Sequence, residues 1–265
     1  MTRNINAKRT VVKIGTNVIT NINGTLDLKL IKKLVAQIAG IKKNGKDVIV
    51  ITSGAIGAGM KELKLKEKPR DAIMQQVCAS IGQHILMSNY QAMFKKHKIK
   101  VAQILLTYYD FSDKKTSGYI HNSINKLLRL KVVPIINEND PISIDEIGPS
   151  FGDNDMLSAL IASKMKADLL VILTDVDGLF DKNPNKNGAV LIKEVKNIGK
   201  YIESLGGKPN ALGLGGMKTK IKAAKIATKN GATVVIANGR KEDVLLKIVN
   251  GSDAGTVFYP KWKLN

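Results

Sequence analysis

The chain has 265 residues, 44% of them hydrophobic, so it is long enough to bury a sizeable core. Its apolar runs are too short to span a membrane, and its N-terminus lacks an apolar signal core. The net charge is +20, yet lysine supplies 37 of the 42 basic residues, whereas nucleic-acid readers favour arginine. Cys78 is the only cysteine, which excludes an internal disulfide and favours a cytoplasmic location.

Strands and helices alternate along the sequence. Helices are predicted by apolar spacing at 26–43, 69–96, 112–130, 153–166, 217–230 and 242–249. Apolar strands are predicted at 8–15, 47–52, 101–106, 132–136, 169–173, 233–237 and 255–259, with a hairpin or edge strand at 188–195. This order predicts an α/β fold with a mainly parallel sheet and helices on both faces. Since no linker or repeat interrupts it, we expect one domain over residues 1–265.

Glycine-rich and polar segments follow successive strands. Ligands of such sheets bind beyond the carboxyl ends of the strands. Lys13 lies inside the first strand, where it needs an anionic partner unless it points to solvent on an edge. The later segments are TSGAIGAG (52–59), NEND (137–140), FGDND (151–155), TDVDGLFDKNP (174–184) and GLGGMKTK (213–220). Backbone amides in such glycine turns suit phosphate or carboxylate groups, although a tight packing turn is the simpler explanation for any one of them.

Several common site types are excluded. There is no GxxxxGK[ST] loop, no GxGxxG after a strand, and no HRD or DFG signature. One cysteine and three histidines give little support for a thiol protease or a zinc site. The stretch DVDGLFDKN has its glycine too early for a calcium loop and lacks the final glutamate.

Lysines beside a glycine loop indicate phosphoryl transfer, in which catalysis is mainly positioning and charge stabilisation. A carboxylate acceptor, with a pKa near ~4.3, needs no general base, which fits the low histidine content. Lys13 and Lys220 are candidates to neutralise the approaching anions, with Mg²⁺ on the nucleotide phosphates. Asp155 is the candidate to fix both ammonium groups.

Six motifs carry a resemblance to a known family. They are VVKIGTNVIT, VIVITSGAIGAGM, VVPIINENDPIS, FGDNDMLSALIA, VILTDVDGLFDKNP and GLGGMKTKIKAAKIA, in that order. The chain resembles the amino-acid kinase family from about residue 8 to 259, and NEND with FGDND resembles its glutamate 5-kinases. The resemblance implies an αβα sandwich. It also implies ATP-dependent phosphorylation of L-glutamate to L-glutamyl 5-phosphate, the first step of proline biosynthesis from glutamate.

The resemblance also implies roles for individual residues. The catalytic residues are expected to be Lys13, Lys220 and Asp155. L-glutamate is expected to contact Ser53, Gly54, Ala55, Asn137, Asp140 and Asn154, while Asp153 caps a helix. ATP is expected to contact Lys13, Gly15, Thr174, Asp175, Leu214, Gly215, Gly216, Met217, Lys218, Thr219 and Lys220. Mg²⁺ is expected on the ATP phosphates, with no protein side chain assigned as its ligand.

Two departures from the family pattern occur in the glycine loop, where Leu214 replaces a threonine and Lys218 a small residue. The resemblance further implies a homo-oligomer (dimer or tetramer), feedback inhibition by proline and contact with the next enzyme of the pathway. No membrane association is expected from the short apolar runs. Many members of the family carry a C-terminal PUA domain, whereas this sequence stops just past GTVFYP, so we expect a kinase-only form. Two alternatives stay open: a kinase of this family with a different acid acceptor, and a non-catalytic nucleic-acid-binding protein on this fold.

Overall fold

A mainly parallel sheet forms the centre of the molecule. The computed structural model describes residues 3, 5–21, 24–142, 154–207 and 216–260. Within them the strand order is β3-β4-β2-β1-β5-β7-β8-β6. The strands are β1 (Arg9–Ile14), β2 (Asp47–Ile51), β3 (Val101–Leu106), β4 (Val133–Glu138), β5 (Leu169–Thr174), β6 (Glu194–Val195), β7 (Thr233–Asn238) and β8 (Thr256–Phe258). Strand β8 runs antiparallel to β7, and the other neighbouring pairs are parallel.

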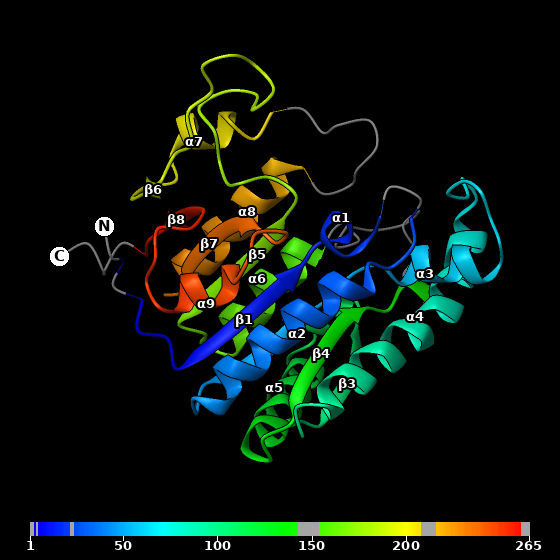
Figure 1. Cartoon of the computed structure of the whole chain (residues 1–265). Coiled ribbons are helices and arrows are strands. Elements are labelled where there is room, and N and C mark those ends of the chain that lie inside the picture. The colour runs from blue at the N-terminus through cyan, green and yellow to red at the C-terminus, as the bar shows by residue number, and fades with distance from the viewer. Residues whose placement is uncertain (1–2, 4, 22–23, 143–153, 208–215, 261–265) are drawn as a thin grey trace.

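Helices cover both faces of this sheet (Figure 1). Helices α2 (Leu28–Lys43), α4 (Ala72–Lys95) and α9 (Val244–Val249) pack with one set of strand residues, which includes Val12 and Val50. Helices α5 (Lys114–Arg129), α6 (Asn154–Lys164) and α8 (Met217–Lys229) pack with the alternate set, which includes Val11 and Ile49. The alternation follows from the two-residue period of a strand. The expected αβα sandwich is confirmed.

The three longest described helices begin at a capping aspartate. The side chains of Asp27, Asp71 and Asp113 accept hydrogen bonds from the amides of Leu30, Met74 and Thr116, at the starts of α2, α4 and α5. Several short elements were not predicted: α1 (Thr16–Ile19), α7 (Lys200–Ser204), η1 (Tyr108–Phe111) and η2 (Asp140–Ile142). Helix α3 (Ala55–Glu62) continues the small-residue turn after β2.

Strand β1 lies where the two halves of the chain meet. Its neighbour β2 continues to β4 and β3, whereas its other neighbour β5 continues to β7 and β8. The carboxyl end of β1 therefore borders both halves, which is the ligand-binding position in open α/β sheets. Lys13 is the penultimate residue of this central strand and is 2% exposed. The alternative that Lys13 points to solvent on an edge strand is therefore wrong.

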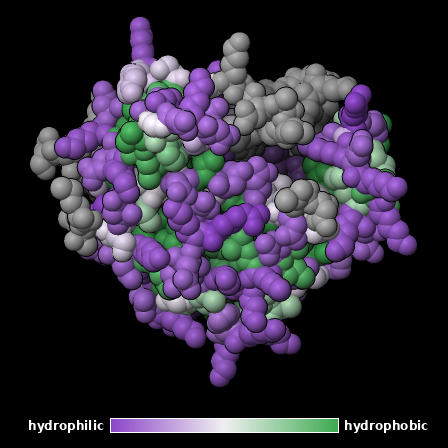
Figure 2. All heavy atoms as spheres, turned by 45° about the horizontal axis from the view of Figure 1, so that its top comes forward, coloured by the Kyte–Doolittle hydropathy of each residue, from purple (hydrophilic) through white to green (hydrophobic). Residues whose placement is uncertain are grey.

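The lysine excess lies largely on the outside. The face shown in Figure 2 is mostly hydrophilic, with smaller hydrophobic areas between the polar side chains. Of the buried polar and charged side chains in the described part of the chain, only two are lysines, Lys13 and Lys220. None of the described helices has the length and apolar character needed to cross a membrane.

Candidate active site

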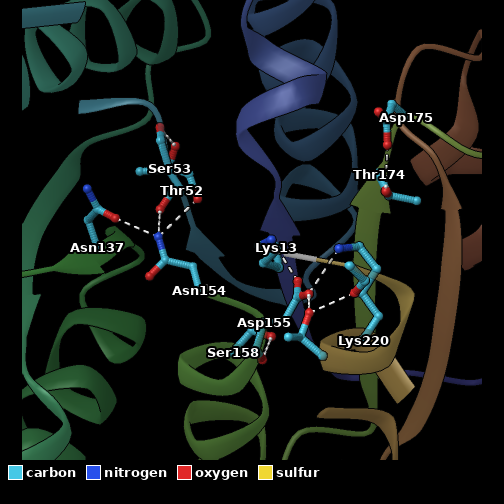
Figure 3. Close-up of polar contacts among 12 residues, drawn as sticks. Lys13, Thr52, Ser53, Asn137, Asn154, Asp155, Ser158, Thr174, Asp175 and Lys220 are labelled. Atoms are coloured by element: carbon cyan, nitrogen blue, oxygen red, sulfur yellow. Dashed lines mark hydrogen bonds and ion pairs between the residues drawn. The ribbon is translucent and has the colours of Figure 1, made fainter. Parts of the chain in front are cut away.

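One carboxylate holds two lysines at the carboxyl end of β1. Lys13 Nζ lies 2.7 Å from Asp155 Oδ1, and Lys220 Nζ lies 3.0 Å from Asp155 Oδ2 (Figure 3). The Asp155 side chain is fully buried, and the two lysine side chains are 2% and 6% exposed. A buried carboxylate and ammonium groups are stable together when they are paired in this way. The three predicted catalytic side chains are thus in direct contact.

The fold explains this contact. Lys13 has the same strand parity as Val11, whose side chain packs with α5, α6 and α8. Asp155 lies in the first turn of α6, and Lys220 in the first turn of α8. Helices α6 and α8 pack against each other on that face. Thr219 Oγ1 also lies 2.8 Å from Asp155 Oδ2, so the residue before Lys220 adds a hydrogen bond to the same carboxylate.

A second cluster surrounds Asn154, the residue before Asp155. Asn154 Nδ2 lies 2.6 Å from the carbonyl oxygen of Thr52, 3.0 Å from Ser53 Oγ and 2.7 Å from Asn137 Oδ1. The Asn154 side chain is 7% exposed, and Asn137 is 2% exposed. Figure 3 shows this cluster beside the lysine–aspartate cluster. Three of the residues predicted to bind glutamate, Ser53, Asn137 and Asn154, therefore come together.

The network fixes which way the Asn154 amide faces. A backbone carbonyl can only accept, so Asn154 must direct its NH₂ group at Thr52. Its Oδ1 is buried and has no hydrogen-bond partner among the described residues. Because an unpaired buried acceptor is costly, such an atom indicates a place for a ligand donor.

Gly54 begins the helix beside this cluster. It caps α3 with φ of 95°, a left-handed conformation that glycine adopts without strain. A Cβ there would also lie 3.3 Å from Ile19 Cδ1. No side chain caps the helix, which leaves the amides of its first turn, starting at Ala55, suited to an anionic group. The predicted residues Gly54 and Ala55 thus lie next to Ser53.

Thr174 and Asp175, which were predicted to bind ATP, lie at the carboxyl end of β5, next to β1. Thr174 Oγ1 donates to Asp175 Oδ1 at 3.1 Å, and Asn17 Nδ2 donates to Asp175 Oδ2 at 3.1 Å. Gly15 follows β1, and its amide donates to the carbonyl oxygen of Leu173.

The described end of the glycine loop leads into α8. Gly216 caps that helix without a side-chain hydrogen bond, so its first amides are suited to phosphate. Met217 is partly buried, and Lys218 is exposed at the start of the helix. Leu214 and Gly215 lie outside the described residues, as does Asp153.

Asp140 is the remaining predicted contact of glutamate. It begins η2, with one residue between it and the end of β4, and is partly buried. Helix η2 packs against α4. Asp140 is therefore at the carboxyl edge of the sheet, on the same side of β1 as Asn137.

The sequence interpretation missed several residues that hold this site. Gln83 on α4 accepts from Asn137 Nδ2 at 2.8 Å, and Tyr90 Oη lies 2.9 Å from Thr52 Oγ1. Burial raises the pKa of Tyr90 to about 12, although the hydrogen bond with Thr52 opposes this shift. Helical spacing contained a signal, since Gln83 lies four residues after Ala79 and three before Leu86, both buried. A glutamine on the apolar stripe of a helix indicates a buried polar partner.

The described side chains suit phosphate groups better than a bare cation. No group of three or more His, Cys, Asp or Glu placed to hold a metal ion occurs in the described parts of the chain. Asp155, the carboxylate at the centre, is engaged by two ammonium groups. Two lysines and the uncapped start of α8 form instead a positively charged setting for the phosphates of a nucleotide.

The chain is similar to known proteins in sequence and in fold. The chain is 51% identical over 257 residues to a glutamate 5-kinase of Methanosarcina barkeri, which covers 94% of this chain and 67% of that protein. It is 46% identical over 261 residues to a glutamate 5-kinase of Clostridium acetobutylicum, covering 97% of each. Among solved structures, the isopentenyl phosphate kinase of T. acidophilum gives a TM-score of 0.65 at 20% identity, covering 94% of this chain and 99% of the other. The UMP kinase of Bacillus anthracis gives a TM-score of 0.64 at 14% identity, covering 96% of each chain.

The solved structures resemble this chain in fold. The two glutamate 5-kinases resemble it in sequence over at least 94% of its length. Residues 8–238 match the amino acid kinase family. The resemblance read from the six motifs is therefore confirmed, and this chain belongs to the amino acid kinase family.

Proposed function

We propose that the protein transfers the γ-phosphoryl group of ATP to the side-chain carboxylate of L-glutamate, forming L-glutamyl 5-phosphate and ADP. The observation that carries the proposal is that consecutive residues serve two different clusters. Asn154 belongs to a neutral hydrogen-bond cluster, and Asp155 to a cluster of lysines. An amino-acid acceptor and a phosphate donor would thus meet at the start of α6.

The acceptor half suits an amino acid. Asn154 Oδ1, a buried acceptor, would receive a hydrogen bond from the α-ammonium group. Asp140, at the same edge of the sheet, would contribute a negative charge. The first turn of α3, from Gly54 and Ala55, would hold a carboxylate.

The transfer half suits an anionic reaction. An oxygen of the glutamate side-chain carboxylate attacks the γ-phosphorus, and the bond from that phosphorus to the leaving oxygen of ADP breaks. No proton has to move, because a carboxylate with a pKa near ~4.3 is already ionised at neutral pH. Lys13 and Lys220 stabilise the negative charge on the transferring phosphoryl group. Asp155 holds one ammonium group on each of its two carboxylate oxygens and so fixes their positions. Mg²⁺ bound with ATP would supply further neutralisation of the phosphate oxygens.

An acceptor panel tests the proposal. The purified chain is incubated with Mg-ATP and L-glutamate, N-acetyl-L-glutamate, L-aspartate, carbamate or UMP, and acyl phosphates are trapped as hydroxamates. ADP release is measured in parallel, because UMP gives no hydroxamate. We expect turnover with L-glutamate alone. Turnover with another acceptor would contradict the glutamate assignment but retain phosphoryl transfer. Absence of turnover, together with salt-sensitive nucleic-acid binding, would favour the binding-protein alternative.

The same proposal includes expectations on domain organisation, location, assembly and regulation. The 97% mutual coverage with the Clostridium acetobutylicum protein supports a single kinase domain over residues 1–265. We also propose a cytoplasmic reaction, a homo-oligomer, proline as an inhibitor, and transfer of the labile acyl phosphate to the next enzyme. Light scattering tests the assembly, and the hydroxamate assay at millimolar proline tests the inhibition. Activity that proline leaves unchanged would remove that part.

A further inference from the structure

A chain of four side-chain amides crosses the carboxyl edge of the sheet. Gln83 Nε2 on α4 lies 3.3 Å from Gln103 Oε1 on β3, and Asn137 Nδ2 on β4 lies 2.8 Å from Gln83 Oε1. Asn154 Nδ2 on α6 lies 2.7 Å from Asn137 Oδ1. Gln103 is exposed, whereas Gln83 is only 6% exposed and the two asparagines are buried. The chain therefore runs from the surface on the α4 side to the buried amide of Asn154.

The amides are joined head to tail, so that the NH₂ group of each one donates to the oxygen of the next, from Asn154 through Asn137 and Gln83 to Gln103. The carbonyl of Thr52 requires the NH₂ group of Asn154, and Asn137 must then present its oxygen to that group. The Asn137 NH₂ group is thereby turned toward α4, where Gln83 supplies the acceptor. If Gln83 were absent, this buried NH₂ group would have to find another acceptor by turning Asn137, and Asn154 would lose a partner. The carbonyl of Thr52 thus sets the direction of the series, and Gln83 supplies the acceptor that Asn137 needs in that direction.

The position of Gln83 is itself rigid. Its neighbour Gly82 lies where α4 meets α3 so closely that a Cβ would overlap the carbonyl oxygen of Ala55. Helices α3 and α4 make the densest helix–helix contact among the described elements. One helix, α4, therefore supports both the first turn of α3 and the amide of Asn137.

We infer that Gln83 is a positioning residue for an amino-acid acceptor, acting through Asn137 to hold Asn154 Oδ1 toward the ammonium group. The inference rests on the proposed function, because it needs an acceptor with an α-amine. A head-to-tail series of amides also polarises its terminal oxygen, which strengthens its bond to a cation. Gln83 should therefore affect the discrimination between L-glutamate and glutarate, the same diacid without the amine.

The test compares variants at Gln83 with both compounds. Gln83→Met keeps the volume but removes the acceptor, and we expect the KM for L-glutamate to rise about tenfold. The inhibition constant of glutarate against L-glutamate and the KM for ATP should stay within about twofold of the unmodified protein. Gln83→Glu keeps an acceptor for Asn137, while the exposed Gln103 can turn to donate, so the ratio of the two constants should be restored. Gln91→Met, at an exposed position of the same helix, serves as the control, with a change below about twofold.

Each outcome decides the inference. Equal weakening of L-glutamate and glutarate in Gln83→Met would show a general structural role and overturn it, as would no change at all. If Gln83→Met does not give a folded protein by circular dichroism, Gln83→Leu poses the same question with a similar apolar volume. Failure of the unmodified protein to phosphorylate L-glutamate would overturn the proposed function instead, so the two failures are distinguishable.

Discussion

Two neighbouring side chains at the start of α6 are held by different physical interactions. Asp155 is surrounded by charge, with lysines from β1 and α8 on its two oxygens. Asn154 is surrounded by neutral groups, and the direction of each hydrogen bond determines how its amide faces. We propose that the charged cluster stabilises a transferring phosphoryl group, whereas the neutral cluster selects what accepts it. Two consecutive residues in the first turn of one helix can therefore serve different purposes, one in acceptor recognition and one in catalysis.

Breaking the charged cluster should have the largest effect. Asp155→Asn removes the carboxylate that both lysines contact, and we expect kcat to fall about 10²–10³-fold. The free energy of unfolding should fall by about 3–5 kcal/mol, as for other broken buried ion pairs. The hydroxamate assay and urea unfolding measure the two effects. A variant with near-normal kcat would show that Asp155 does not organise the lysines.

Removing Lys220 tests the role of one ammonium group while the carboxylate of Asp155 stays in place. Lys220→Met should lower kcat about 10²–10³-fold while changing the KM for L-glutamate little, because Lys220 is proposed to contact the phosphates. The matched control is Lys225→Met on the same helix, whose lysine is exposed and paired with Glu203. It should change kcat by less than about twofold. Similar losses in the two variants would argue against a specific role for Lys220.

A change in the neutral cluster should weaken binding of the acceptor. Asn154→Leu removes the amide oxygen proposed to contact the ammonium group, and kcat/KM for L-glutamate should fall roughly 10- to 100-fold. The KM for ATP should be unchanged, in contrast to a change in the charged cluster. Initial rates with each substrate varied in turn provide the measurement. A raised KM for ATP would place Asn154 on the nucleotide instead.

Tyr90, which contacts Thr52 beside the neutral cluster, should make the free energy of unfolding depend on pH in the alkaline range. The pKa of Tyr90 is raised by burial to about 12 from 10.0, so the neutral phenol is favoured in the folded state. The unfolded chain loses this proton first, and stability present below pH 10.0 is lost as the pH rises toward 12. Tyr90→Phe should cost about 1 kcal/mol at neutral pH but remove about 2–3 kcal/mol of the alkaline loss.

Urea unfolding at pH 8 to 12 checks this prediction, with Tyr109→Phe as the control because Tyr109 is 61% exposed. Equal alkaline loss in the unmodified protein and Tyr90→Phe would contradict it.

An exposed ion pair should show the smallest effect. The hydrogen bond from Lys241 holds the pKa of Asp177 below its usual value, and Asn238 adds to this while desolvation opposes it. The stabilisation is therefore present above the unfolded pKa of 3.8 and is lost as the pH falls through the lower folded pKa. The two side chains are 37% and 59% exposed, so Asp177→Asn should cost less than ~1 kcal/mol. Urea unfolding at pH 2 to 7 measures this, and a loss as large as that of Asp155→Asn would remove the contrast between buried and exposed pairs.

Much of the fold was predictable because its signals are local. Apolar runs marked the main strands, and apolar spacing marked the main helices. The structure adds that Asp27, Asp71 and Asp113 cap three of these helices. The short helices α1 and α7 were missed, because four or five residues carry too little periodicity. Residues 188–195 were expected to form a hairpin or an edge strand, and β6 is an edge strand that pairs in parallel with β8.

The sequence by itself determined which residue types stand at the strand ends, and hence the charged chemistry of Lys13, Asp155 and Lys220. An apolar strand that contains a lysine requires an anion nearby, and among the described residues the buried carboxylate of Asp155 supplies it. Only the tertiary structure decided that Gln83 would meet Asn137, or that the carbonyl of Thr52 would orient Asn154. Neutral hydrogen bonds act over about 3 Å and depend on direction, so the packing of α4 and α6 on opposite faces of the sheet had to be known first.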